Sequence, residues 1–310
     1  MQALWMVLAA LIFATMGVCV KIASAWFTSA ELVLYRGLIG IVFLWVLARS
    51  RGVSLATRVP GMHAWRSLVG VVSLGAWFYA IANMPLATAM TLNYMSSVWI
   101  AAFLVGGALL AWVPVPGRDG RVPRPPLQGP LVLTVLAGFG GVVLMLKPTV
   151  GDNQGFAGLM GLLSGLTAAF AYMQVVALSR LGEPEARTVF YFALGSAVAG
   201  GAATLLGGFT PWADWTWKHA LWLLPVGVLA ALGQLCMTRA YASAKTESGT
   251  LVVANLQYSG IVFAAFYSVW LFGDRIDAAG WAGMGLIVAS GIAATVLRQR
   301  SLPKAPAEEH

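Results

Sequence analysis

The stretch ALWMVLAALIFATMGVCVKIAS, residues 3–24, contains one charged side chain, Lys21, close to its end. A helix needs roughly 20 mostly apolar residues to cross the hydrocarbon core of a bilayer, and this stretch supplies them. A secretory signal peptide would have a basic region before the apolar run and a small-residue cleavage site after it, and neither pattern is evident. The stretch therefore predicts a retained first transmembrane helix.

The rest of the sequence continues in the same way. Of its 310 residues 59% are apolar and 10% are charged, with a mean hydropathy of +0.81, whereas soluble domains carry about 25% charged residues. Apolar runs between polar or Gly/Pro punctuation predict spans at residues 3–24, 30–48, 67–83, 89–112, 129–146, 157–178, 188–208, 220–242, 249–271 and 279–297. The predicted fold class is an all-α integral membrane protein with ten transmembrane helices.

The nineteen basic residues are distributed unevenly between the two sets of connectors. Three lie inside or at the ends of spans and three in the connectors on the far side from the N-terminus: Lys21, Arg36 and Arg239, then Lys147, Lys218 and Arg275. The remaining thirteen lie in connectors on the N-terminal side, so the positive-inside rule places both termini in the cytoplasm. The Trp-rich connector with Trp212, Trp215 and Trp217 is then expected outside, as part of an aromatic belt. Bases scattered between apolar runs do not form the patch that nucleic-acid binding needs.

The two halves of the sequence resemble each other. Leu92-Asn93-Tyr94 in the fourth span corresponds to Leu256-Gln257-Tyr258 in the ninth, and each motif follows a Tyr-Ala pair. A chance tripeptide is the alternative for the motif alone. Because each half would hold five helices, an odd number, equivalent helices run in opposite directions and the halves are inverted repeats. The expected organisation is a first repeat at 1–147, an outer connector at 148–156, a second repeat at 157–297 and a cytoplasmic tail at 298–310.

Inverted repeats are typical of secondary transporters, which bind their substrate near the midplane where the repeats meet. The chain also resembles the drug/metabolite transporter superfamily, in particular the EamA-type members with ten helices. The resemblance depends on Lys21 closing the first helix, Arg36 early in the second, residues 91–99 and 255–263, and residues 271–275 before a Gly-rich last helix, although Asp274 stands where Glu is commoner.

The resemblance implies a carrier of small metabolites in a bacterial inner membrane, with lipid and a small molecule as its partners. Members of the superfamily carry amino acids, nucleotide sugars, drugs or other metabolites, and bacterial ones are often exporters. The aromatic content favours an exporter or facilitator of amino acids, aromatic ones included, that works by alternating access. A drug or nucleotide-sugar transporter is the alternative within the family, and a monomer is one expectation for its assembly. No cofactor or metal is expected.

Polar side chains within spans are candidates for the substrate site, because a polar group in the bilayer core needs a partner or a water-filled cavity. Aromatic side chains can pack on an apolar or aromatic tail of the substrate. The candidates are Asn93, Tyr94 and Ser97 in the fourth span, Asn255, Gln257, Tyr258 and Ser259 in the ninth, and the aromatic residues Trp77, Tyr79, Trp99 and Tyr172. For each residue singly, an interhelical hydrogen bond or plain packing is the alternative interpretation.

Four charged residues near or inside spans have expected gating or structural roles. Lys21 is expected at the outer interface, where a lysine can snorkel as an anchor. Arg36 lies deep enough to need a partner, either Glu31 or a backbone carbonyl, with gating as the alternative. Arg239 either attracts a substrate carboxylate or reinforces the orientation.

All eleven acidic residues fall at span ends or in connectors, and His63, His219 and His310 are also peripheral. We therefore expect no carboxylate proton relay, so facilitated diffusion or exchange of neutral or zwitterionic solutes is favoured. A membrane-embedded enzyme is the least favoured class, since neither a metal site nor a nucleophile with its base can be assembled in the core. A channel stays an alternative, although no filter loop is visible.

Overall fold

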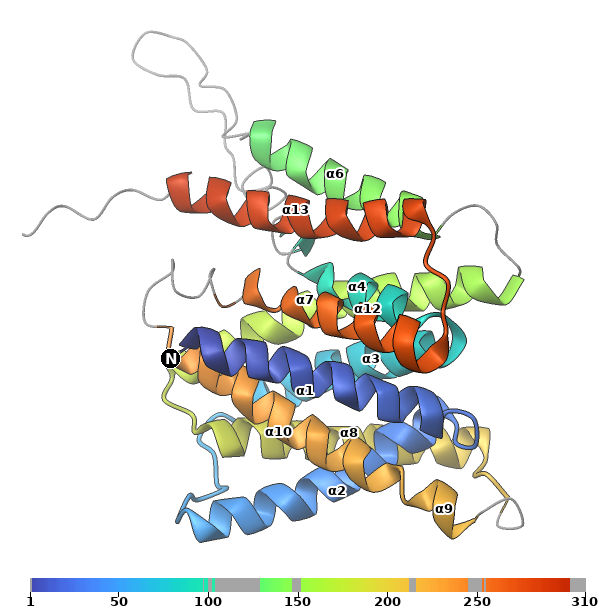
Figure 1. Cartoon of the computed structure of the whole chain (residues 1–310). Coiled ribbons are helices and arrows are strands. Elements are labelled where there is room, and N and C mark those ends of the chain that lie inside the picture. The colour runs from blue at the N-terminus through green and yellow to red at the C-terminus, as the bar shows by residue number, and fades with distance from the viewer. Residues whose placement is uncertain are drawn as a thin grey trace, which may run out of the picture.

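The computed structural model describes residues 2–96, 98–99, 102–103, 129–146, 152–211, 216–244, 253 and 255–301. All regular structure within these ranges is helical (Figure 1). The helices are α1 (Gln2–Ala23), α2 (Ser29–Ser50), α3 (Pro60–Asn83), α4 (Leu86–Tyr94), α6 (Gly129–Leu146), α7 (Asp152–Arg180), α8 (Glu185–Gly207), α9 (Trp217–Ala220), α10 (Leu223–Ala242), α12 (Ser259–Phe272) and α13 (Ala278–Ser301).

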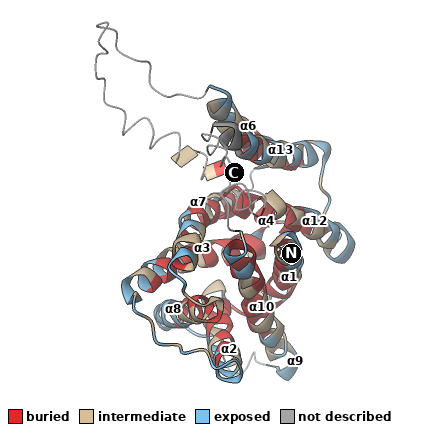
Figure 2. Cartoon of the chain, turned by 90° about the vertical axis from the view of Figure 1, so that its left-hand side faces the viewer, coloured by how far each residue is buried: buried red, intermediate tan, exposed pale blue. Residues whose placement is uncertain are grey.

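Apart from the four-residue α9, the described helices fall on the ten predicted spans, which confirms an all-α fold with ten helices. Six helices in the described part of the chain are long and apolar enough to cross a membrane, and α12 is a shorter apolar helix. Buried residues face the centre of the bundle and exposed ones its periphery (Figure 2). Large apolar side chains such as Leu206 (91% exposed) and Trp270 (75%) lie on that periphery, as expected for a surface solvated by lipid.

One predicted boundary moves in a way that matters for function. The apolar run predicts a third span that begins at residue 67, but α3 begins at Pro60. Proline is favoured at the first position of a helix, because its fixed φ suits the helix and its missing N–H would have had no partner there. The correction moves His63 and Arg66 from a connector into a helix, where both are buried.

The fourth and ninth spans are interrupted at the repeated motifs. Helix α4 ends at Tyr94, and Met95 forms a turn in which its N–H approaches the carbonyls of both Thr91 and Leu92. In the second half, Gln257 and Tyr258 form a turn, and the Tyr258 N–H donates to the Asn255 carbonyl before α12 starts. The continuous spans predicted at 89–112 and 249–271 are therefore replaced, within the described residues, by helices that break within or directly after the repeated motif.

Glycines let the helices approach closely. Helix α2 packs along α8, and each contributes a glycine to the contact: Gly37 lies against the backbone of Ala197, and Gly200 against that of Leu34. In α7, Gly161 and Gly165 are four residues apart on one face and lie against Leu92 of α4, so they let the two helices pack closely. Helices α3 with α7, α1 with α10, and α6 with α13 form the other extensive contacts.

Candidate functional site

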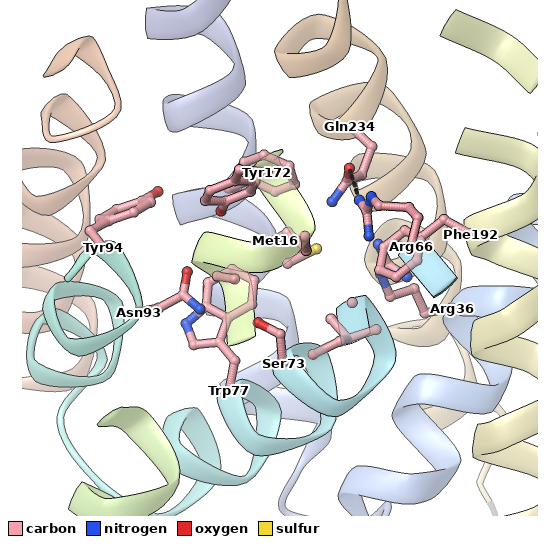
Figure 3. Close-up of a pocket in the computed structure, with 15 residues that line it drawn as sticks. Met16, Arg36, Arg66, Ser73, Trp77, Asn93, Tyr94, Tyr172, Phe192 and Gln234 are labelled. Carbon is pink, nitrogen blue, oxygen red and sulfur yellow. Dashed lines mark hydrogen bonds between the residues drawn. The ribbon is translucent and has the colours of Figure 1, made fainter. Parts of the chain in front are cut away.

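A cavity lies between the helices in the interior of the bundle (Figure 3). The cavity has a volume of about 50 Å³, which is room for a few water molecules. Helices α1, α2, α3 and α4 line it from the first half of the chain, and α7, α8 and α10 from the second. Its polar and aromatic lining residues are Phe13, Arg36, Arg66, Ser73, Trp77, Asn93, Tyr94, Tyr172, Phe192 and Gln234.

One end of the cavity is cationic. Arg36 of α2 (4% exposed) and Arg66 of α3 (3% exposed) both lie beside the ring of Phe192, with their guanidinium carbons 4.9 and 4.2 Å from its centroid. Arg36 Nη1 donates to Ser196 Oγ (3.1 Å), and Arg66 Nη2 donates to Gln234 Oε1 (3.4 Å). Figure 3 shows the two side chains converging on Phe192 at one side of the cavity.

These two arginines carry charge that no acidic side chain of the described residues neutralises. Within the described residues, no ion pair includes either guanidinium, and no acidic residue lines the cavity. Three of their buried nitrogens, Arg36 Nε and Arg66 Nε and Nη1, have no hydrogen-bond partner. A buried charge without compensation costs several kcal/mol, so this end of the cavity is suited to receive an anion.

The other end of the cavity is aromatic and amide-rich. Asn93 Nδ2 donates to Ser164 Oγ (3.1 Å), while the Tyr94 hydroxyl and the Trp77 Nε1–H are buried without a hydrogen-bond partner. Tyr172 lies between the two ends (Figure 3), and its hydroxyl accepts a 2.9 Å hydrogen bond from Gln257 Nε2. The cavity therefore joins a charged end to an end that presents flat rings and two unused donors.

The structure brings five of the predicted site residues together around this cavity. They are Arg36, Trp77, Asn93, Tyr94 and Tyr172. Gln257 reaches it through Tyr172, whereas Tyr258 packs against Gly291 of α13 and the Ser259 hydroxyl bonds the Leu256 carbonyl of its own segment.

The other predicted site residues lie away from the cavity. Tyr79 packs edge-on against Phe156 (5.3 Å between centroids), and Trp99 packs in the same way against Phe139 (4.9 Å). Asn255 has a partner of its own and does not line the cavity. Ser97 lies outside the described residues.

The expected pairing of Arg36 with Glu31 is not what the structure shows. Glu31 is the third residue of a capping box: its carboxylate accepts from the Thr28 N–H (2.8 Å) and from the N–H of Thr210 (2.8 Å). Side chains five residues apart on a helix point about 140° away from each other. Glu31 therefore caps α2 and holds the loop after α8, while Arg36 turns toward the cavity.

Lys21 connects several elements through polar contacts, in addition to its predicted place at the outer interface. Its ammonium donates to the Met84 carbonyl (3.0 Å) and approaches Asp274 Oδ2 (3.5 Å) and the Phe272 ring (5.0 Å from the centroid). The Ser268 hydroxyl donates to the same carboxylate oxygen. These contacts, which we call the Lys21 tie, join α1 to the α3–α4 junction and to the turn after α12.

At the other end of the bundle a second polar cluster joins the halves. Glu183 accepts from Thr57 (3.1 Å) and from Arg187 (3.1 Å), and its second oxygen also lies 3.1 Å from His63 Nε2. Burial alone would raise the pKa of the Glu183 carboxyl, but the hydrogen bonds from His63, Arg187 and Thr57 outweigh it and hold the pKa below its ordinary value. This cluster, the Glu183 tie, fastens the α2–α3 loop to the α7–α8 turn. Arg239, in contrast, is exposed and lies over the Trp5 ring.

Three residues of the charged end of the cavity are not among the sequence-predicted candidates: Arg66, Phe192 and Gln234. Arg66 falls in a connector between the predicted spans, and Phe192 and Gln234 fall inside the spans predicted at 188–208 and 220–242. Pro60 was the available signal, since proline marks a helix start and places Arg66 six residues inside α3. For Gln234 and Phe192 no local signal existed, because only the packing of α8 and α10 on α3 brings them to Arg66.

No family model matches the sequence. The pseudopaline exporter of Pseudomonas aeruginosa (strain UCBPP-PA14) is 35% identical over 292 residues, which cover 93% of each chain. The riboflavin transporter of Rhizobium johnstonii is 30% identical over 78% of this chain and 74% of its own length. An uncharacterised transporter of Helicobacter pylori (strain J99) is 27% identical over 92% of this chain. A solved protein structure matches the fold with a TM-score of 0.60 at 19% identity, covering 96% of this chain and 98% of its own.

Proposed function

Because the chain belongs to the family of multi-pass bacterial membrane transporters that includes the pseudopaline exporter, we propose that it is a carrier which exports or equilibrates a small organic metabolite by alternating access. Its relatives are transporters and not enzymes. The observation that carries the proposal is the central cavity, which both halves of the chain line with buried polar and aromatic side chains. A site shared by two halves opens to either side when one half rocks against the other.

The packing of the helices supports an inverted repeat. An inverted repeat makes each helix of the first half equivalent to one of the second half. In chain order, α1, α2, α3, α4 and α6 correspond to α7, α8, α10, α12 and α13. The pair α3 with α7 then becomes α10 with α1, and α1 with α12 becomes α7 with α4; all four pairs are in contact. The pairs α2 with α8, α4 with α12 and α6 with α13 map onto themselves and are also in contact. This is the contact pattern that a two-fold axis in the membrane plane would produce.

The topology can be tested separately from transport. An odd number of helices per repeat requires the connector around residues 147–155 to face the opposite side of the membrane from the N-terminus. Tags at the N-terminus and in that connector are expected to be accessible from opposite sides. Accessibility of both from one side would remove the basis for the inverted repeat.

The aromatic end of the cavity fits a metabolite with a planar or apolar body, and an amino acid, aromatic ones included, is the substrate that the sequence alone favours. The relatives' substrates, pseudopaline and riboflavin, widen the range of solutes to be tried. Since the cavity has room for only a few waters, a solute of this size requires its walls to separate, as a conformational cycle would allow.

Counterflow in vesicles reconstituted with the purified protein tests the proposal. Preloaded unlabelled solute is expected to accelerate the uptake of labelled solute, because a carrier returns loaded faster than empty. A channel, the alternative function, would show no such trans-stimulation. Uptake of the labelled solute that does not respond to preloading would overturn the carrier proposal.

The lining also supports a carrier without a carboxylate proton relay. No Asp, Glu or His is among the described residues that line the cavity. An imposed pH gradient alone is therefore expected not to drive accumulation of solute in the vesicles. Accumulation under that gradient would refute this part of the proposal.

A further inference from the structure

We propose that the transported metabolite is a net anion and that Arg36 and Arg66 bind its carboxylate. This inference rests on the proposed transport function and names the chemical class of its substrate. It departs from the neutral or zwitterionic solute that the distribution of acidic residues favours. Three properties of the cavity carry it: its uncompensated charge, the kind of polar atoms left unpaired, and the absence of a counter-group for a cation.

The first property is charge. Arg36 and Arg66 belong to different helices, yet both guanidinium groups approach one ring, that of Phe192. Their protein partners are neutral: the hydroxyl of Ser196 and the amide of Gln234. Two guanidinium groups of like charge repel each other and are poorly solvated at this depth. A carboxylate between them would relieve both costs, since an arginine fork matches carboxylate geometry.

The second property is the type of unpaired atom. The buried polar atoms of the cavity lining that have no hydrogen-bond partner are Arg36 Nε, Arg66 Nε and Nη1, Trp77 Nε1 and the Tyr94 hydroxyl. The four nitrogens carry N–H groups that can only donate, and the hydroxyl can donate as well. Buried donors of this kind are nearly always satisfied in folded proteins. The complementary ligand is therefore rich in acceptors, as a carboxylate is.

The third property separates an anion from a zwitterion. A free amino acid would bring an ammonium group, which needs acceptors and preferably a negative charge. Among the described lining residues there is no carboxylate, and the amide oxygen of Gln234 already accepts from Arg66. An ammonium group close to the two arginines would add a third positive charge. The cavity therefore favours acids whose amino group is absent or substituted.

The aromatic end indicates what the rest of the solute looks like. Trp77 and Tyr94 offer flat surfaces away from the arginines, with Asn93 beside them and Tyr172 between the two ends (Figure 3). An organic body can pack there, and the two unused donors can bind a second acceptor group on it. Inorganic anions would fill the arginine end and leave the aromatic end unused.

Binding to the purified, full-length protein tests the inference. The probes are succinate, citrate, N-acetylphenylalanine, its neutral amide, free phenylalanine and, as inorganic anions, chloride and sulfate. Saturable thermal stabilisation is expected with at least one carboxylate, and weaker or no stabilisation with the amide and free phenylalanine. Replacement of one charged hydrogen-bonding group, in Arg66→Gln or Arg36→Gln, is expected to weaken carboxylate binding roughly tenfold to a hundredfold. Arg239→Gln, at an exposed arginine outside the cavity, is expected to bind as the wild type does.

A purely structural role for the pair predicts a different result. If Arg66 mainly holds helices together, Arg66→Met would lower the melting temperature of the ligand-free protein. If Arg66 instead serves to bind an anion, Arg66→Met removes an uncompensated charge and keeps an apolar side chain. The melting temperature of the ligand-free variant is then equal to or above the wild-type value. The inference is overturned if no carboxylate stabilises the protein, if the neutral amide stabilises it as much as the acid does, or if both glutamine variants bind the carboxylate as tightly as the wild type. An effect of chloride or sulfate alone would also overturn it.

Counterflow separates this inference from the transport proposal. Trans-stimulation by a neutral or zwitterionic solute, but by none of the carboxylates, would sustain a carrier and overturn the anionic substrate. Anion binding that is lost in Arg66→Gln, without counterflow of any solute, would sustain the anion site and overturn the carrier.

Discussion

Several hydroxyl groups inside the bundle bond a carbonyl of their own helix. Thr91 donates to the Ala87 carbonyl, Ser196 to that of Phe192 and Thr204 to that of Gly200, each one turn back. Such bonds let a polar residue reside in lipid without a tertiary partner. An intramembrane hydroxyl is thus weak evidence for a site, and a buried donor without any partner is stronger evidence.

Tyr94 allows a direct test of whether an unpaired buried hydroxyl takes part in transport. Its hydroxyl has no hydrogen-bond partner, while its ring is buried and packs against Gly260. Tyr94→Phe is therefore expected to keep or raise the melting temperature and to lower the transport rate roughly twofold to tenfold, the contribution of one neutral hydrogen bond. Tyr79→Phe, outside the cavity, is the matched control. Equal transport by the two variants would reassign the Tyr94 hydroxyl to packing.

Small residues determine how closely the helices pack, and turns determine where α4 ends and α12 begins. Helix α4 ends and helix α12 begins inside the bundle, at the turns of Met95 and Gln257–Tyr258, beside the residues that line or support the cavity. Broken helices are tolerated at membrane depth where the exposed backbone is buried in protein or faces a cavity. The repeated Leu-x-Tyr motif lies at both breaks. The similarity between the two halves therefore extends from their sequence to the place where these helices are interrupted.

The contact between α7 and α4 depends on Gly165. A Cβ there would collide with the backbone oxygen of Leu92, which cannot move as a flexible side chain can. Gly165→Ala is expected to destabilise the protein by about 1–3 kcal/mol, the usual cost of overpacking. Gly75→Ala is the control, since nothing lies within 4 Å of its added Cβ and alanine is the better helix former. Melting temperatures in detergent would decide, and a stabilised Gly165→Ala would contradict the packing described.

The Glu183 tie should respond to pH with a definite sign. The folded protein holds the pKa of this carboxyl below its ordinary value of about 4.3. The stabilisation is therefore fully present above that ordinary value and is lost as the pH falls through the lowered one. The difference in melting temperature between wild type and Glu183→Gln should be larger at pH 5 than in more acidic buffer. A difference that grows on acidification would show that the carboxylate is not the stabilised form.

Across the whole molecule, the two ties lie at opposite ends of the bundle with the cavity between them. The Lys21 tie joins segments from both halves at one end, and the Glu183 tie does so at the other. Alternating access requires such closures to open in turn. Each tie is polar and partly buried, which suits a contact that must form and break repeatedly.

Labelling of a cysteine in the cavity tests this arrangement. Cys19 and Cys236 are free and buried, so both would first be replaced by alanine. With Ser73→Cys lining the cavity, a membrane-impermeant maleimide added at the Lys21 end should react faster after Asp274→Asn, because the tie is weakened. Glu183→Gln, which loosens the opposite end, should not accelerate labelling from this side. The same acceleration in both variants would show that neither tie closes one particular end.

The sequence by itself determined the membrane environment, the helical class and the approximate places of ten helices, because these depend on the composition and length of each apolar run. It also indicated Arg36, Trp77, Asn93, Tyr94 and Tyr172 as candidate site residues. A polar residue within a span needs a partner or a cavity, and an aromatic one can pack on a substrate. The tertiary structure alone decided that Glu31 caps its own helix, that Lys21 ties helix ends together, and that Arg66, Phe192 and Gln234 meet Arg36 in one cavity. Those outcomes depend on which helix faces which, and that is settled by close packing between distant segments that leaves no trace in any single stretch.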